Sequence, residues 1–124
     1  MKIRVYYEDT DAGGIVYHTN YIKYCERARS EVFFQQEQLP SDGEKSGFVV
    51  RNINADFLGT AILGDMLEVT TEILQRKSAS LVLLQSVLKE EKVIFKMEIT
   101  LVFIRNGRPK AIPENLYAIL NNAQ

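Results

Sequence analysis

The sequence predicts an α+β domain in which one antiparallel sheet packs on, or wraps around, a single long helix. Two observations support this prediction. One segment shows the 3.6-residue spacing of an amphipathic helix, and the segments after it mostly alternate apolar and polar residues, as half-buried strands do. Because no repeat, low-complexity tract or linker interrupts the chain, residues 1–124 are predicted to form a single domain.

The first expected elements are a short strand and the long helix. Residues 2–7 alternate, so Ile3, Val5 and Tyr7 would share one face of a strand. A helix is expected over residues 20–38, about 28 Å long at 1.5 Å per residue. Its apolar side chains recur at helical spacing: Tyr21, Cys25, Ala28 and Val32. Thr19 or Asn20 would cap its start by accepting a hydrogen bond from a first-turn amide.

The rest of the chain is expected to form mostly strands. Residues 48–57, 65–77, 80–89 and 92–104 are the candidates, and residues 58–64 would form a bend. Residues 80–89 are apolar on both faces, which predicts a central place in the sheet. Asn106-Gly107 predicts a hairpin turn, because both positions tolerate positive φ. A last strand over residues 110–112 and a helix over residues 114–121, opened by Pro113, would follow.

The composition excludes several classes of function. With 15 basic and 16 acidic residues, the chain has no overall positive field for nucleic acid or anionic membrane. One His and one Cys cannot build a disulfide framework or the usual zinc sites. No nucleophile elbow, dinucleotide fingerprint or Walker loop is present. The start of the chain lacks the apolar region of a signal peptide, and no stretch has the length of a transmembrane helix, so we expect a cytoplasmic protein.

Polar groups gather between the first strand and the helix. Glu8, Asp9 and Asp11 precede two glycines, and the only histidine, His18, follows them. A helix start presents unpaired amides that suit a carbonyl oxygen gaining negative charge, and a nearby carboxylate could act as base or nucleophile. On composition alone, a solvated turn is the more common explanation of such a run. A calcium loop fits poorly, because Asn20 stands where a bidentate Glu is needed.

The run VYYEDTDAGGIVYH over residues 5–18, with Asn20-Tyr21 and the ERAR run at residues 26–29, resembles the hotdog-fold acyl-CoA thioesterases. It most resembles the bacterial subfamily associated with the Tol–Pal cell-envelope system, which is related to hydroxybenzoyl-CoA thioesterase. The resemblance implies a hotdog fold, an antiparallel sheet wrapped around one long central helix. It also implies hydrolysis of acyl-CoA to free acid and CoA without a metal or bound cofactor.

The resemblance also implies roles for individual residues. Asp11 would be the nucleophile or general base, and the backbone amide of His18 would polarise the thioester carbonyl. The His18 side chain would orient Asp11, its water or the thioester. Tyr7 could aim its phenol into the site, or it could be an ordinary core tyrosine. The residues expected to contact the acyl group are Val16, Tyr17, Phe57, Leu58, Gly59 and Thr60.

Other residues are assigned weaker roles. Glu26 is a secondary acid candidate, whereas Cys25 shares the apolar helix face and is expected in the core. The candidates for contact with the phosphates of coenzyme A are Lys77, Ser78, Ser80, Arg105 and Arg108.

The expected partners are acyl-CoA, with acyl carrier protein as a possible second, and further copies of the chain. Apolar residues on both faces of residues 80–88 and 92–104 predict at least a dimer, with a tetramer as the favoured assembly. A peripheral place at the inner membrane is compatible with the cytoplasmic assignment. Two other functions stay open: a noncatalytic acyl-binding or scaffold module of the envelope or lipid-synthesis machinery, and a hotdog dehydratase.

Overall fold

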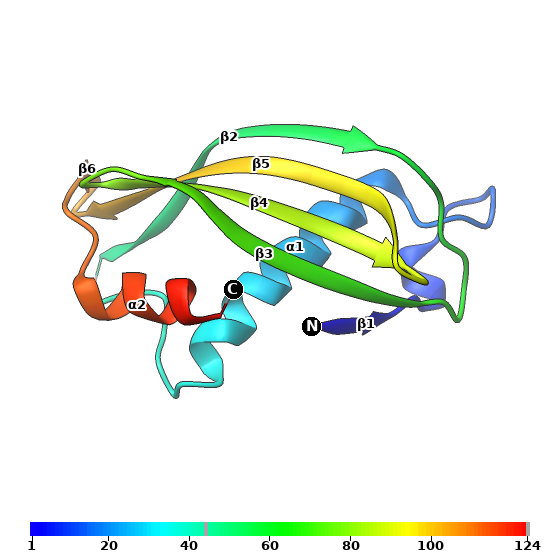
Figure 1. Cartoon of the computed structure of the whole chain (residues 1–124), viewed down its shortest axis with the longest axis horizontal. Coiled ribbons are helices and arrows are strands. Elements are labelled where there is room, and N and C mark those ends of the chain that lie inside the picture. Colours follow the sequence, from blue (N-terminus) through cyan, green and yellow to red (C-terminus); the bar gives the residue numbers. More distant parts are fainter. Residues whose placement is uncertain (44, 124) are drawn as a thin grey trace.

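One antiparallel sheet dominates the computed structural model, which describes residues 1–43 and 45–123. The strands are β1 (Lys2–Arg4), β2 (Ser46–Phe57), β3 (Met66–Arg76), β4 (Ser80–Lys89), β5 (Lys92–Arg105) and β6 (Arg108–Pro109). Their order across the sheet is β1-β3-β4-β5-β2, and β6 pairs with β5. The sheet curves over the long helix α1 (His18–Phe34), and the short α2 (Glu114–Asn122) lies at one end (Figure 1). The predicted fold class is confirmed.

The core lies between the concave face of the sheet and α1. Alternate residues of β5 are at most 4% exposed: Phe95, Met97, Ile99, Leu101 and Phe103. Leu67 and Val69 of β3 are buried as well, so in both strands the apolar members of the alternating pattern lie on the inner face of the sheet. The central place of β4, between β3 and β5, is confirmed as well.

The first strand is shorter than the alternation predicts. β1 ends at Arg4, and residues Tyr7–Asp9 form a turn of 3-10 helix, because the Asp9 carboxylate accepts a hydrogen bond from the Tyr6 amide at 2.9 Å. Tyr7 therefore leaves the inner face and is 81% exposed. Both the extension of the strand to Tyr7 and a core position for its side chain were wrong.

The long helix begins and ends earlier than expected. It starts at His18, behind an extended Tyr17 that makes no side-chain cap, so neither Thr19 nor Asn20 caps it as predicted. It ends at Phe34, because Glu37 adopts a positive φ of 53° and the Gln38 amide donates back to the Phe33 carbonyl.

The carboxyl-terminal part differs from the prediction at one strand. Asn106 and Gly107 have φ of 52° and 77°, so the predicted hairpin turn is confirmed. β6 is only Arg108–Pro109, and the strand expected over residues 110–112 was wrong, since the Ile112 amide leaves the sheet ladder to bond Ser78. This exit lets α2 place Leu116 and Leu120 in the core. None of the helices in the described residues is long and apolar enough to cross a bilayer.

Candidate functional site

The loop that carries Asp11 is a tight hairpin held at several points. Thr10 and Val16 form an isolated bridge, and inside it the Asp11 amide donates to the Ile15 carbonyl at 2.9 Å. Gly14 closes the turn with a φ of 84°, which explains the glycine that the motif has there. The Val16 amide then donates to the Ala61 carbonyl, so the loop is tied to the segment that follows β2.

Asp9 connects this loop to the start of α1. Its carbonyl accepts hydrogen bonds from the Tyr17 amide at 2.9 Å and from the Asn20 side-chain amide at 2.8 Å. Both Asp9 and Asn20 are buried. The Asp9 carboxylate also forms the preceding turn, because it accepts a hydrogen bond from the local Tyr6 amide. The bond from Asn20 was missed, because the sequence pattern favoured a capping role for that residue.

The carboxylate of Asp9 also faces Tyr24. Burial and the nearby Asp9 charge raise the pKa of the Tyr24 phenol well above its usual range. Its hydroxyl has no hydrogen-bond partner within the described residues. The Asp9 side chain thus has a structural role. Of Asp9 and Asp11, only Asp11 is therefore available to act on a substrate.

Asp11 presents its side chain to solvent from the tip of the loop. One oxygen, Oδ1, accepts a hydrogen bond from the Gly13 amide at 2.8 Å, whereas Oδ2 has no partner in the part of the chain that is described. A Cβ at Gly13 would lie 3.2 Å from Oδ1, so a larger residue would crowd this carboxylate. The arrangement orients one carboxylate oxygen and leaves the other free to act on a substrate or water.

The start of α1 offers the complementary charge. Within residues 1–43 and 45–123, the amides of His18 and Thr19 have no acceptor, and the Asn20 amide bonds only the Tyr17 carbonyl. These free amides carry the partial positive charge of a helix start. The His18 ring packs on Tyr17, with centroids 4.6 Å apart, and meets the Phe57 ring edge-on at 5.9 Å. No hydrogen bond or ion pair joins the side chains of His18 and Asp11 in the described residues.

The structure brings most of the expected acyl-contact residues to the helix start. Phe57 is 50% exposed and contacts His18, and the Leu58 and Gly59 amides both donate to the Ile94 carbonyl. These two hydrogen bonds to one carbonyl turn the chain, so that Leu58, which is 53% exposed, and Thr60 face solvent. Tyr17 is half exposed as well. Val16 is only 3% exposed, so its side chain supports this surface from the core.

Other candidates lie outside this group. The Tyr7 side chain makes no hydrogen bond or ring contact within the described residues. Glu26 accepts a hydrogen bond from the Ser30 hydroxyl and forms no ion pair with Arg29 or a strand residue in the described part of the chain. Cys25 is fully buried, and burial raises the pKa of its thiol to about 12, so its predicted place in the core is confirmed.

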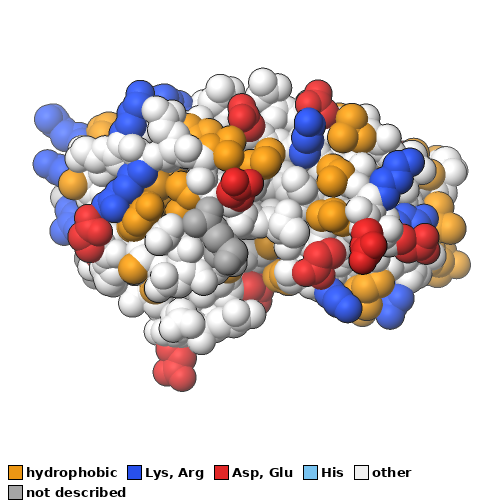
Figure 2. Space-filling model, in the orientation of Figure 1, with side chains coloured by type: hydrophobic (Ala, Val, Ile, Leu, Met, Phe, Trp, Pro, Cys, Tyr) orange, Lys and Arg blue, Asp and Glu red, His pale blue; other side chains and the backbone are white. Residues whose placement is uncertain are grey.

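The suggested phosphate contacts are far from Asp11 in the same chain. Lys and Arg side chains gather at the end of the molecule where β6 lies (Figures 1 and 2). Arg105 is ten residues beyond Phe95, the β5 residue against Phe57, and thus about 33 Å further along the strand. Arg105 also forms an ion pair with Asp42. These residues cannot serve the Asp11 loop of their own chain without a large rearrangement.

Sequence reasoning also missed a cavity lined by Arg29, Phe33 and Phe48. A signal for it was present, because Arg29 stands four residues from both Cys25 and Phe33 and therefore shares their helix face. None of the described residues forms a cluster of three or more His, Cys, Asp or Glu side chains suited to a metal ion.

Known proteins resemble the chain over nearly its whole length. The family profile of the thioesterase-like superfamily matches residues 5–120. The acyl-CoA thioesterase YbgC of Helicobacter pylori is 45% identical over 133 aligned residues, covering 98% of both chains. The acyl-CoA thioester hydrolase YbgC of Escherichia coli O6:H1 is 39% identical and covers 94% of this chain and 90% of its own. The crystal structure of a probable thioesterase from Bartonella henselae superposes with a TM-score of 0.84 at 30% identity, covering 91% of this chain and 97% of that one.

Proposed function

Because the chain belongs to the thioesterase-like superfamily, we propose that it hydrolyses acyl-CoA thioesters to a free acid and coenzyme A. This membership confirms the family that the motif at residues 5–18 predicted. The relatives named as acyl-CoA thioesterases align with almost the entire chain, so the proposal concerns the whole domain.

One observation carries the proposal. A single short loop presents an exposed carboxylate, Asp11, and leads directly into a helix start whose His18 and Thr19 amides have no acceptor in the described residues. Hydrolysis of a thioester needs these two features: a group that delivers an oxygen to the carbonyl carbon, and donors for the oxyanion that results. Asp9 and Asn20 hold the two ends of the loop together.

These positions support the following reaction as our proposal. The thioester oxygen would accept a hydrogen bond from the His18 amide, and the partial charge of the helix start would stabilise the oxyanion as it forms. In one route the free oxygen of Asp11 attacks the carbonyl carbon, the carbon–sulfur bond breaks, and water then hydrolyses the mixed anhydride. In the other route Asp11 removes a proton from the attacking water. Both routes release coenzyme A as the thiol after protonation and need no cofactor.

The acyl group would lie over the surface formed by Tyr17, Phe57, Leu58 and Thr60, with Gly59 holding the bend and Val16 below. The His18 ring lies between Tyr17 and Phe57 and would hold the thioester in place at this surface. Several of these apolar side chains are about half exposed. Binding of substrate or of a second copy of the chain would bury this apolar surface and would be favoured for that reason.

We expect the second copy at β2. This strand has 12 residues and, among the described residues, pairs only with β5, so its outer edge offers backbone groups without a partner there, and the exposed Val49 and Val50 lie on it. Pairing two β2 edges would make a continuous sheet. Light scattering at micromolar concentration should give the mass of a dimer or a tetramer, and a monomer would contradict this part of the proposal.

The test of the activity is release of thiol from acyl-CoA by the purified protein. Because Cys25 is buried, the protein's own thiol contributes little background. Asp11→Asn keeps the size of the side chain and should abolish turnover, whereas Glu8→Gln removes an exposed carboxylate of the same region and should leave turnover unchanged. Equal rates for wild type and Asp11→Asn would overturn the assignment of Asp11.

Substrates from acetyl-CoA to palmitoyl-CoA, with an aromatic acyl-CoA, define the preferred acyl group. Binding of these thioesters without hydrolysis would indicate an acyl-binding module instead. Hydration of an enoyl-CoA without thiol release would indicate a dehydratase.

The two roles of Asp11 can be separated with labelled water. In a single turnover in H₂¹⁸O, label in the Asp11 carboxylate identifies the nucleophilic route, because only a mixed anhydride that water attacks at the protein carbonyl delivers a water oxygen to Asp11; attack at the acyl carbonyl labels the product acid. The general-base route places the label in the product acid.

A part for the Tyr7 hydroxyl stays a prediction, which Tyr7→Phe tests with little risk to the fold because the side chain is exposed.

A further inference from the structure

The aromatic ring of Tyr21 lies beneath the acyl surface. Tyr21 is three residues beyond His18, so both side chains lie on the same side of α1. The residue is only 3% exposed. Its ring stacks on the Phe95 ring, with centroids 5.3 Å apart and 13° between the planes, and it meets the Phe57 ring edge-on at 6.3 Å. Neither the proposed hydrolysis nor the proposed acyl contacts use this side chain.

Phe57 is less confined than the rings that support it. Phe95 lies opposite Phe57 in the β2–β5 pair, with ring centroids 5.1 Å apart, and is fully buried. Phe57 is the last residue of β2 and is 50% exposed. Its inner side therefore rests on Tyr21 and Phe95, whereas its outer side belongs to the acyl surface and contacts His18. A change beneath Phe57 is thus transmitted to the surface on which the acyl group would lie.

The hydroxyl of Tyr21 has a separate contact. Burial raises the pKa of the Tyr21 phenol, and a hydrogen bond with the Ala61 backbone lowers it in part. The Ala61 carbonyl accepts the Val16 amide at 2.9 Å and so anchors the loop that carries Asp11. Because the ring and the hydroxyl support different parts of the site, a Tyr21→Phe variant separates their effects.

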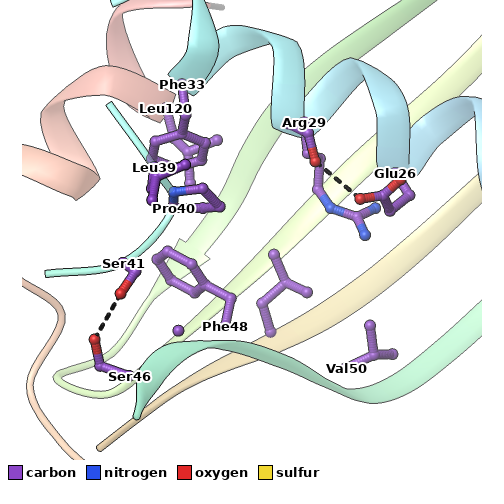
Figure 3. Close-up of a pocket in the computed structure, with 13 residues that line it drawn as sticks. Glu26, Arg29, Phe33, Leu39, Pro40, Ser41, Ser46, Phe48, Val50 and Leu120 are labelled. Carbon is purple, nitrogen blue, oxygen red and sulfur yellow. Dashed lines mark hydrogen bonds between the residues drawn. The ribbon is translucent and has the colours of Figure 1, made fainter. Parts of the chain in front are cut away.

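Tyr21 does not line the cavity of about 500 Å³ beside the second half of α1, whose walls include Arg29, Phe33 and Phe48 (Figure 3). Loss of the Tyr21 ring would therefore leave those walls in place. The neighbours of a deleted core side chain relax partly into the space that it leaves. Since Phe95 is enclosed within the sheet, Phe57 is the neighbour expected to sink, and the acyl surface next to His18 would become deeper.

We propose that Tyr21 is a positioning residue that determines acyl specificity: its ring holds Phe57 at a height that limits the bulk of the acyl group beside the thioester carbonyl. The proposal rests on the proposed function for the identity of the ligand, an acyl thioester. Tyr21 acts only through Phe57. A thinner side chain at position 21 should admit acyl groups that carry a ring or a branch next to the carbonyl.

The experiment compares kcat/KM for benzoyl-CoA and for acetyl-CoA. The ratio of the two values does not depend on the fraction of folded protein, because both substrates meet the same active molecules. Tyr21→Leu should raise the ratio of benzoyl-CoA to acetyl-CoA by about tenfold or more, the range that a few atoms of pocket space produce. Tyr21→Phe keeps the ring and should leave the ratio unchanged. Tyr21→Met, which is closer to Tyr in volume, should shift the ratio in the same direction if Tyr21→Leu does not fold.

Tyr24→Leu is the matched control. Tyr24 is a buried tyrosine of the same helix, and its ring contacts Tyr21 at 6.2 Å but has no contact with Phe57 in the described residues. Its replacement should leave the substrate ratio unchanged. The path through Phe57 is tested by repeating Tyr21→Leu in a Phe57→Ala background, where no ring can sink and the ratio should no longer respond.

A second measurement needs no turnover. His18 is the only histidine of the chain, so its imidazole proton signals are unambiguous in an NMR spectrum. The Phe57 ring lies 5.9 Å from the His18 ring, and its ring current contributes to the position of these signals. Tyr21→Leu should therefore move them, whereas the same change in the Phe57→Ala background should not. If the protein hydrolyses no thioester, this measurement still decides whether Tyr21 positions Phe57.

Three results would overturn the proposal. An unchanged substrate ratio in folded Tyr21→Leu would show that the Tyr21 ring does not limit the acyl group. An equal change of the ratio in Tyr24→Leu would indicate a general loosening of α1. Equal effects of Tyr21→Leu with and without the Phe57 ring would show that Tyr21 does not act through Phe57.

Discussion

Replacing Asn20 by leucine should separate the positioning of the Asp11 loop from the stability of the fold. The side chain is buried, and its amide donates to the Asp9 carbonyl at 2.8 Å. That carbonyl also accepts from the Tyr17 amide at 2.9 Å, so Asn20→Leu leaves no orphaned acceptor. The loss should therefore equal one net hydrogen bond, about 1 kcal/mol of the free energy of unfolding. For a domain of this length, the expected decrease in Tm is about 3 to 5 °C.

The effect on activity should be larger than the effect on stability. Asp9 lies two residues before Asp11, and its carbonyl is the point where the loop meets the start of α1. Because a displacement of about 1 Å at a reacting group can cost about a hundredfold in rate, kcat/KM in the thiol-release assay should fall by roughly ten- to a hundredfold.

The matched control is Thr19→Val, which changes the adjacent, exposed side chain and should alter neither Tm nor rate. If Asn20→Leu lowers Tm as expected but keeps kcat/KM within twofold of wild type, the bond does not position the loop, and this reasoning is refuted.

Three further predictions concern other parts of the molecule. Gly14→Ala should lower the free energy of unfolding in urea by about 1 to 2 kcal/mol, since the added methyl meets no atom and only the φ of 84° is strained; unchanged stability would contradict this. Cys25 should not react with a thiol reagent at pH 8 until the protein unfolds, because burial raises its pKa to about 12, and fast labelling of the native state would refute its burial. Lys89 and the Ile62 amide lower the pKa of the Asp65 carboxyl in the folded protein. The contribution of Asp65 to stability is therefore complete at a pH above its unfolded-state pKa of about 3.9, and it disappears as the pH falls through the lower pKa of the folded state. Asp65→Asn should therefore reduce the loss of stability in acid relative to wild type; parallel curves for the two proteins would exclude this contribution.

Much of the fold could be predicted because strand and helix periods are local properties. β4 was expected over residues 80–89 and observed as Ser80–Lys89, and the faces of β5 followed from simple alternation. The turn at Asn106-Gly107 was equally local, since these two residues tolerate positive φ.

The errors occur where a distant or side-chain hydrogen bond overrides the local pattern. The alternation at residues 2–7 continues to Tyr7, but the Asp9 carboxylate bends the chain at Tyr6. The expected cap Asn20 turns to the Asp9 carbonyl, and the helix starts two residues earlier. Periodicity cannot show that either hydrogen bond replaces the local pattern, because both bonds depend on which groups lie close together after folding.

The sequence by itself determined the fold class, the order of the strands along the chain and the family, since these depend on residue types at fixed spacing, whereas the roles of Asp11 and His18 stay predictions that the resemblance of residues 5–18 implies. Only the tertiary structure decided that the His18 ring lies against Phe57, 39 residues away, and that Tyr7 faces solvent. It alone revealed Arg29 beside an apolar cavity, held by Gln85 from another strand. These contacts join residues that are remote in the chain, and the closure of the sheet over α1 is the physical event that brings them together.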